Sequence, residues 1–171
     1  RRFDVVFVLG LEEGSLPRRG ASSPFLDDDA RRTLDAGGAR LQRPDPVITF
    51  WSGATQRIAE DVTLVQCGGH FAGGTVLHWA AGAGGRGALL TADILAVTMD
   101  RQFVTFMRSY PNMIPLSPKQ VTAIGTALEP FAFDTVYSHF FDRVIPTGGK
   151  LALQVSIQRY LDALAGAYEK G

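Results

Sequence analysis

Two polar residues, His70 and Asp93, have side chains that could do chemistry, and each follows a strand-like apolar run. The run at residues 62–66 ends shortly before His70, and the run at residues 88–91 ends just before Asp93. Strand ends fix the direction of a side chain, so both groups are expected at one edge of a sheet. Imidazole and carboxylate are ordinary ligands of zinc, iron and manganese. The pair therefore predicts part of a metal site at that edge.

The elements that must position this pair are short strands separated by glycine-bearing turns. The β-type runs lie at residues 47–51, 62–66, 75–79 and 88–91. Their spacing is typical of a meander, which places consecutive strands side by side in one layer. A further strand is predicted at residues 133–137, after a long irregular stretch and a helix.

Two helices are expected beside this layer. The first begins at Ser117, which is a suitable N-cap, with Pro118 in the first turn and Gln120 completing a capping box. Its buried stripe is predicted to be Val121, Ile124 and Leu128. The terminal segment repeats apolar residues at helical spacing, from Leu153 to Tyr168. The fold class predicted from these elements is α/β (α+β), with a mainly antiparallel or mixed sheet and helices on one face.

Composition limits the classes of function. The chain has 171 residues, of which 46% are hydrophobic, enough for one main folding unit. Its formal net charge is zero and its basic residues are scattered, so binding to nucleic acid is not favoured. No apolar run approaches the roughly 20 residues of a membrane-spanning helix, so no membrane partner is expected. The single cysteine, Cys67, excludes an intramolecular disulfide and favours a cytoplasmic location.

Two kinds of sequence meet near residue 45. Charge density falls by more than half between residues 1–45 and residues 46–171. The first part contains an apolar run at residues 4–9, predicted to be a strand, and a charged segment at residues 23–34, predicted to be a short helix. We expect residues 1–45 to form a segment without its own core and residues 46–171 to form the domain. The chain begins at Arg1, and we expect a segment upstream of it to be missing.

Residues 42–171 resemble the C-terminal half of a metallo-β-lactamase-fold metallo-hydrolase of the glyoxalase-like kind. The stretches that carry the resemblance are residues 42–51, 68–79, 89–93 and 109–116. The resemblance implies half of an αββα sandwich, in which His70 is a metal ligand and Asp93 is a carboxylate bridging two ions. His139, just after the last predicted strand, lies where many members have a final histidine ligand. One or two ions of zinc, iron or manganese and a small ester, thioester or lactone substrate are implied.

The chain departs from that family in two ways. The His-x-His-x-Asp-His motif, which supplies the first ligands, is absent, so the metal site is incomplete. Ala92 stands where the family usually has glycine, and its methyl either displaces the carboxylate of Asp93 or is harmless if the local φ is negative. A half-domain should also expose an apolar sheet face, which predicts self-association or shielding by residues 3–9.

Other candidates have ordinary readings. His78 is interpreted as structural, and Cys67 as a small buried hydrophobe rather than a nucleophile. Residues 1–45, chiefly residues 3–19, resemble a short stretch of a superfamily 1 helicase or helicase-nuclease subunit. The alternative function is therefore an inactive or interaction fragment of an ATP-dependent DNA helicase-nuclease. The meeting of two families at residues 40–46 suggests the hypothesis of a fused reading frame.

Overall fold

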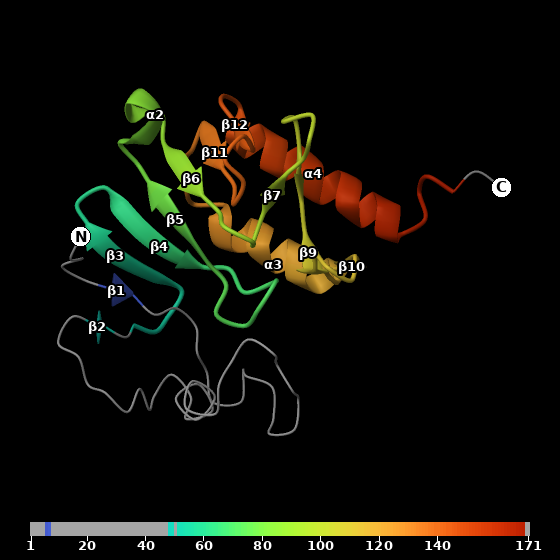
Figure 1. The fold of residues 1–171 in the computed structure, drawn as a ribbon, viewed down its shortest axis with the longest axis horizontal. Helices are drawn as coiled ribbons and strands as arrows, with labels where there is room; N and C mark the ends of the chain where they lie inside the picture. The colour runs from blue at the N-terminus through green and yellow to red at the C-terminus, as the bar shows by residue number, and fades with distance from the viewer. Residues whose placement is uncertain (1–5, 8–47, 50, 170–171) are drawn as a thin grey trace, which may run out of the picture.

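The computed structural model describes residues 6–7, 48–49 and 51–169 (Figure 1). The strands in chain order are β1 (Val6–Phe7), β2 (Ile48–Thr49), β3 (Thr55–Ala59), β4 (Val62–Gln66), β5 (Thr75–Trp79), β6 (Ala88–Leu90), β7 (Ala96–Val97), β8 (Val104–Thr105), β9 (Met107–Ser109), β10 (Ile114–Pro115), β11 (Thr135–Tyr137) and β12 (Val144–Ile145). The helices are α2 (Gly82–Gly85), α3 (Pro118–Leu128) and α4 (Gly149–Leu164).

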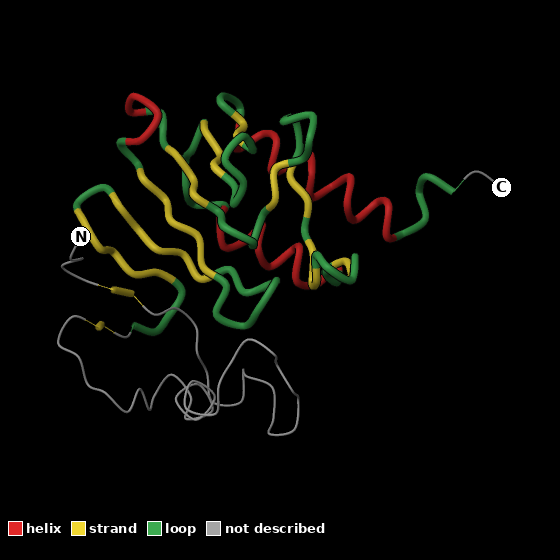
Figure 2. Tube along the Cα trace, viewed as in Figure 1, coloured by secondary structure: helices red, strands yellow, loops and turns green. Residues whose placement is uncertain are grey.

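A six-stranded sheet in the order β12-β11-β6-β5-β4-β3 organises the fold. Strand β11 runs parallel to β6, and the other neighbours in this sheet are antiparallel. Figure 2 shows the strands of this sheet gathered on one side of the molecule, with the two long helices beside them. The fold is therefore mixed α/β with a mostly antiparallel sheet, as the sequence predicted.

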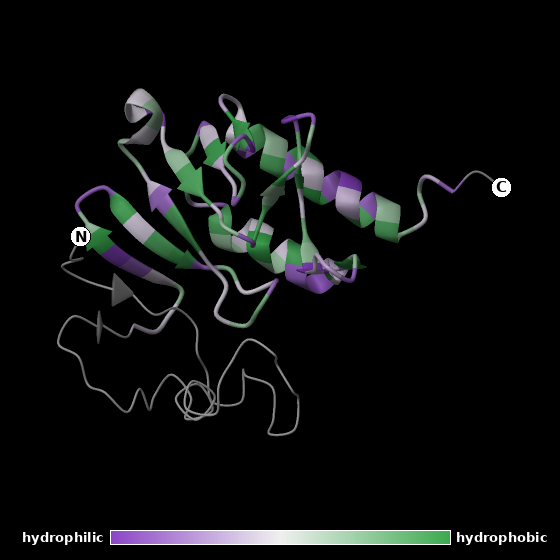
Figure 3. Ribbon diagram, in the orientation of Figure 1, coloured by the Kyte–Doolittle hydropathy of each residue, from purple (hydrophilic) through white to green (hydrophobic). Residues whose placement is uncertain are grey.

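The core lies between the sheet and helices α3 and α4, which contact each other. One row of paired residues across the sheet, His78, Leu89 and Val136, is buried on this side. The predicted stripe of α3 is confirmed, because Val121, Ile124 and Leu128 are all buried in the same core. Helix α4 alternates hydrophobic and hydrophilic residues along its length (Figure 3) and buries Leu153.

The start of α3 is confirmed, although one detail differs. The hydroxyl of Ser117 accepts a hydrogen bond from the backbone N–H of Gln120, so Ser117 is the N-cap. The expected return bond of a capping box is replaced by two other contacts of the Gln120 side chain. Its Oε1 accepts from the Ser117 hydroxyl, and its Nε2 donates to the carbonyl oxygen of Gly69 at 3.4 Å. The helix start is thereby tied to the loop that carries His70.

The sequence prediction missed several strands. Strand β3 was not predicted, because its sequence is mostly polar, as an exposed edge strand allows. The last strand that the sequence predicts is at residues 133–137, but β12 follows and pairs with β11. The irregular stretch before α3 contains four short strands, which form the hairpins β7–β8 and β9–β10. Among the described residues of the run at 47–51, Ile48–Thr49 form β2, which pairs in parallel with β1. Residues 82–85 form a helical turn.

Some sequence predictions lie outside the described residues. The helix at 23–34, the helicase-like segment at 1–45 apart from Val6–Phe7, and the junction at 40–46 are of this kind. Within the part that the structure describes, no helix is long and apolar enough to cross a membrane.

The second face of the sheet is partly open. On this face Leu77 pairs with Leu90, and Leu90 pairs with Tyr137. Leu90 and Tyr137 remain 40% and 43% exposed, and the neighbouring Trp79 is 44% exposed. Leu64 and Ala88 of the same face are buried, at 5% and 1% exposure. The second face therefore exposes an apolar patch at Trp79, Leu90 and Tyr137, whereas the helix-facing row is buried.

A buried hydroxyl on α4 gives a first testable prediction. Ser156 is 3% exposed, and its Oγ accepts a hydrogen bond from the backbone N–H of Val104 at 2.9 Å. Ser156→Ala leaves that buried N–H without a partner, so we expect the free energy of unfolding to fall by about 1–3 kcal/mol. Urea unfolding measures the change. Gln154→Ala, at an exposed position of the same helix, is the control, and an equal loss in both variants would contradict the assignment.

Candidate functional site

His70 lies in the loop between β4 and β5, and glycines determine the shape of that loop. Two hydrogen bonds close it, from the N–H groups of Cys67 and Gly68 to the carbonyl oxygen of Gly74. Gly69 has φ +86°, and a Cβ there would lie 2.9 Å from Cδ1 of Ile124. A side chain at Gly69 would therefore strain the backbone and require the tip of Ile124 to shift. At Gly74 a Cβ would clash with the backbone oxygen of Gly68, so the closed loop requires glycine there.

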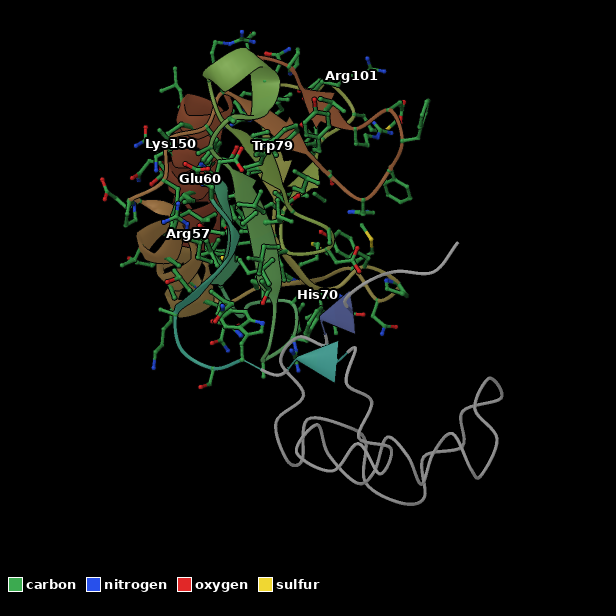
Figure 4. The ribbon with its side chains drawn as sticks, turned by 90° about the vertical axis from the view of Figure 1, so that its left-hand side faces the viewer. Arg57, Glu60, His70, Trp79, Arg101 and Lys150 are labelled. Atoms are coloured by element: carbon green, nitrogen blue, oxygen red, sulfur yellow. The ribbon has the colours of Figure 1, made fainter. Side chains whose placement is uncertain are left out.

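The imidazole of His70 is held in one tautomer. Its Nδ1 lies 2.8 Å from the carbonyl oxygen of Met107, which can only accept a hydrogen bond. Nδ1 therefore carries a proton, so in the neutral imidazole the lone pair is on Nε2. This arrangement, with the outer nitrogen bonded to a backbone carbonyl, is common for histidines that bind metal ions. Figure 4 shows His70 toward one end of the sheet, with Trp79 farther along β5.

Asp93 lies in the turn after β6, and buried hydrogen bonds fix that turn. The hydroxyl of Thr91, fully buried, donates to the carbonyl oxygen of Leu95 at 2.7 Å. Ala92, between these two residues, has φ +43°. The methyl of Ala92 was expected to be harmless only with a negative φ, so it is strained here. The carboxyl side chain of Asp93 itself is 49% exposed. The turn therefore offers the carboxylate at the surface while storing backbone strain at Ala92.

His139 follows β11 and meets Asp93 because of the parallel pairing of β11 with β6. Register joins Tyr137 to Leu90, so the residues after both strands emerge at the same edge. Nδ1 of His139 lies 3.2 Å from the carbonyl oxygen of Ala92 and 3.5 Å from Oδ1 of Asp93. As in His70, the backbone carbonyl favours a proton on Nδ1 and leaves Nε2 free. The carboxylate and this imidazole form a close pair.

Tyr110 lies between His70 and the Asp93–His139 pair, and the sequence did not predict it as a site residue. Its ring centroid lies 5.4 Å from that of His70 and 5.5 Å from that of His139. Its hydroxyl approaches the backbone carbonyl oxygen of Asp93 at 3.4 Å. Burial, followed by the negative charge of Asp93, raises the pKa of Tyr110 to about 12. The phenol is therefore protonated, and able to donate, throughout the neutral range.

The expected ligands do not converge on one point. Among the described residues, no group of three or more His, Cys, Asp or Glu side chains is placed to hold a metal ion. Asp93 and His139 are together, and His70 reaches them through the ring of Tyr110. The donor types suit zinc, iron or manganese, but their number is too small for a complete site. The ligand roles of His70, Asp93 and His139 stay predictions.

The ordinary readings of two other residues are confirmed. Cys67 is buried, and this burial raises the pKa of its thiol to about 12, so it is a neutral thiol rather than a nucleophile. Nε2 of His78 lies 2.7 Å from the carbonyl oxygen of Ala132, and its ring packs on Phe131. His78 therefore ties the sheet to the segment after α3.

The fold and site together define a mixed α/β chain with three candidate metal-binding side chains at one sheet edge. No protein-family model matches the chain. The chain is 43% identical over 124 residues to the uncharacterized protein YmaE of Bacillus subtilis (strain 168), a match that covers 72% of this chain and 45% of YmaE. It therefore spans less than half the length of that relative.

A solved structure also shows a likeness. It is described as the first B3 metallo-β-lactamase with an active-site glutamic acid. The alignment has a TM-score of 0.42 and 19% identity, and it covers 80% of this chain and 53% of that one. A likeness of this size identifies no activity for the present chain.

The strained turn before Asp93 generates a second prediction. Ala92→Gly should raise the free energy of unfolding by about 0.5–1 kcal/mol, because relief of left-handed strain, about 1–2 kcal/mol, exceeds the added entropy of the unfolded chain. Urea unfolding measures it. Ala123→Gly, at an exposed position in α3, is the matched control and should lower stability by about 1 kcal/mol. A loss in both variants would show that Ala92 is unstrained.

Proposed function

We propose that this chain is one half of a metal-dependent hydrolase of the metallo-β-lactamase fold, and that a complementary half supplies the missing ligands. The observation that carries the proposal is how the two imidazoles are held. Both His70 and His139 have Nδ1 against a backbone carbonyl, and Nδ1 of His139 also lies 3.5 Å from the half-exposed carboxylate of Asp93. Two oriented imidazoles and one carboxylate at a single edge are typical of metal ligation.

The chain's own residues would hold and orient the ion. Carbonyl oxygens of Met107 and Ala92 fix the ring direction of the two histidines. Asp93 contributes negative charge next to His139. A bound zinc, iron or manganese ion would supply Lewis acidity for hydrolysis. The absent His-x-His-x-Asp-His motif is the part that the other half would add.

Apolar side chains on the same loops favour an ester-like substrate over a highly charged one. The loops that bear His70, Tyr110 and His139 each also bear an exposed large hydrophobic residue close by. Phe71 follows His70, Met113 lies three residues after Tyr110, and Phe140 and Phe141 follow His139. Such a rim suits the apolar part of an ester, thioester or lactone.

The open sheet face supports the need for a second half. Leu90 and Tyr137 lie on this face, just before the turns that carry Asp93 and His139. A layer packed there would cover the apolar face and bring further ligands to the site edge. The relative YmaE, of which the chain covers 45%, is long enough to contain such a layer.

Metal content tests the ligand assignment. A complex of this chain with its complementary half should hold zinc, iron or manganese at a near-stoichiometric level, measured by inductively coupled plasma mass spectrometry. His70→Ala and Asp93→Ala should each lose most of it, because removing one ligand from a small set weakens binding steeply. Asp162→Ala, on α4 away from the site, is the control. Unchanged metal content in the two ligand variants would refute the proposal.

The open face makes a separate prediction about the isolated chain. We expect it to self-associate at micromolar concentration, because an uncovered apolar face loses water when it is paired. Sedimentation velocity measures the associated fraction, which Leu90→Lys should reduce. Leu151→Lys changes an exposed leucine of α4 instead and should leave association unaltered. A wild-type chain that stays monomeric at all concentrations would contradict the open-face interpretation.

A further inference from the structure

Tyr110 lies in the connection between β9 and β10, and it contacts His70 and His139 through its ring and the backbone of Asp93 through its hydroxyl. Its ring meets His70 at a centroid distance of 5.4 Å with a 45° tilt, and His139 at 5.5 Å with a 56° tilt. Its hydroxyl points to the main chain of Asp93. No direct ring contact between His70 and His139 accompanies these within the described residues. The tyrosine is therefore the element that the three share.

We propose that Tyr110 is a positioning residue that divides the site into two donor groups, His70 on one side and the Asp93–His139 pair on the other. The inference rests on the proposed function where it concerns a metal ion, whereas the contacts of Tyr110 are present without any metal. Because the ring packs against both imidazoles, neither can turn toward the other without displacing it. The hydroxyl adds a contact to the turn that carries Asp93.

This division explains why the three predicted ligands do not form one cluster. A single ion would need all three donors within about 2.0–2.2 Å. Among the described residues, no three candidate ligands are placed to share an ion, and the ring of Tyr110 contacts the imidazoles of both His70 and His139. His70 and the Asp93–His139 pair are therefore separate donor groups.

The separation also assigns different surroundings to the two groups. His70 lies in the glycine loop that packs on α3 through Gly69. The Asp93–His139 pair lies over the parallel strands β6 and β11. The two groups are thus positioned by different parts of the fold, and Tyr110 sets the spacing between them.

Nuclear magnetic resonance of the imidazole C–H groups in the metal-free chain tests the inference. An aromatic ring packed against an imidazole displaces its resonances, so Tyr110→Leu should move the signals of both His70 and His139. Tyr110→Phe keeps the ring and should restore both signals to near their wild-type positions. His78, which packs on Phe131 instead, is the internal reference and should not move.

Controls separate this effect from general loss of structure. Tyr168→Leu removes an exposed tyrosine after α4 and should leave all three histidine signals in place. If Tyr110→Leu moves only one site imidazole, or if Tyr110→Phe moves both as far as Tyr110→Leu does, the ring does not separate the two groups and the inference is overturned.

Adding Zn²⁺ to the same samples distinguishes this inference from the proposed function. The His139 signal should respond to Zn²⁺ in the His70→Gln variant as it does in the wild-type chain, because the two donor groups are separate. Loss of that response would show one shared ion across Tyr110 and would overturn the inference. If Zn²⁺ moves neither imidazole even with the complementary half present, the proposed function fails, while the metal-free spectra still decide the role of Tyr110.

Discussion

The parallel pairing of β6 with β11 is the constraint on which the site depends. Every other neighbouring pair in the six-stranded sheet is antiparallel. Two parallel strands end at the same edge, so the turns that follow Leu90 and Tyr137 must meet. With an antiparallel β11, His139 would emerge at the opposite edge from Asp93. A parallel pair also requires a long connection, and that connection contains α3, whose stripe fills the core.

Buried hydrogen bonds then convert strand direction into side-chain position. The Thr91 hydroxyl reaches the carbonyl oxygens of both Leu95 and Tyr137, so one buried side chain joins the turn after β6 to the end of β11. The backbone N–H of Thr91 also donates to Tyr137 and extends the ladder by one residue. A buried hydroxyl with two partners tolerates little displacement, because an unsatisfied polar group is costly. Asp93 and His139 each lie two residues after a residue joined by these hydrogen bonds, so their backbone positions are fixed as well.

Local sequence signals were sufficient for most elements of the sheet and for both helices. Apolar β-branched runs gave β4, β5 and β6, and the N-cap at Ser117 gave the start of α3. Strand β3 was not predicted, because its pairing with β4 rather than its own composition makes it a strand. The hairpins before α3 are only two or three residues per strand, too short for a period to show.

The candidate site was predictable in part for the same reason. His70 and Asp93 stood out because each follows an apolar run. Their relation to each other, and the pairing of Asp93 with His139, depends on which strands are neighbours and is absent from local sequence. Tyr110 lies in the stretch 109–116 that carries the resemblance, but it was not singled out as a site residue because a tyrosine among short strands is an ordinary core residue. Its role comes from contacts between loops that are far apart in the chain.

The one-sided core separates the stability of the chain from completion of its site. Residues facing α3 and α4, such as Leu89, Ile124 and Val136, are fully buried without any contribution from the second face. Burial of this kind is the main favourable term in folding, so the sheet can form before anything covers its open side. The open face and the site nevertheless share strands β6 and β11, since Leu90 and Tyr137 lie two or three residues from Asp93 and His139. A layer that covered that face would therefore also border the edge that carries Asp93 and His139, so under the proposed function one packing event would bury the face and bring in the further ligands.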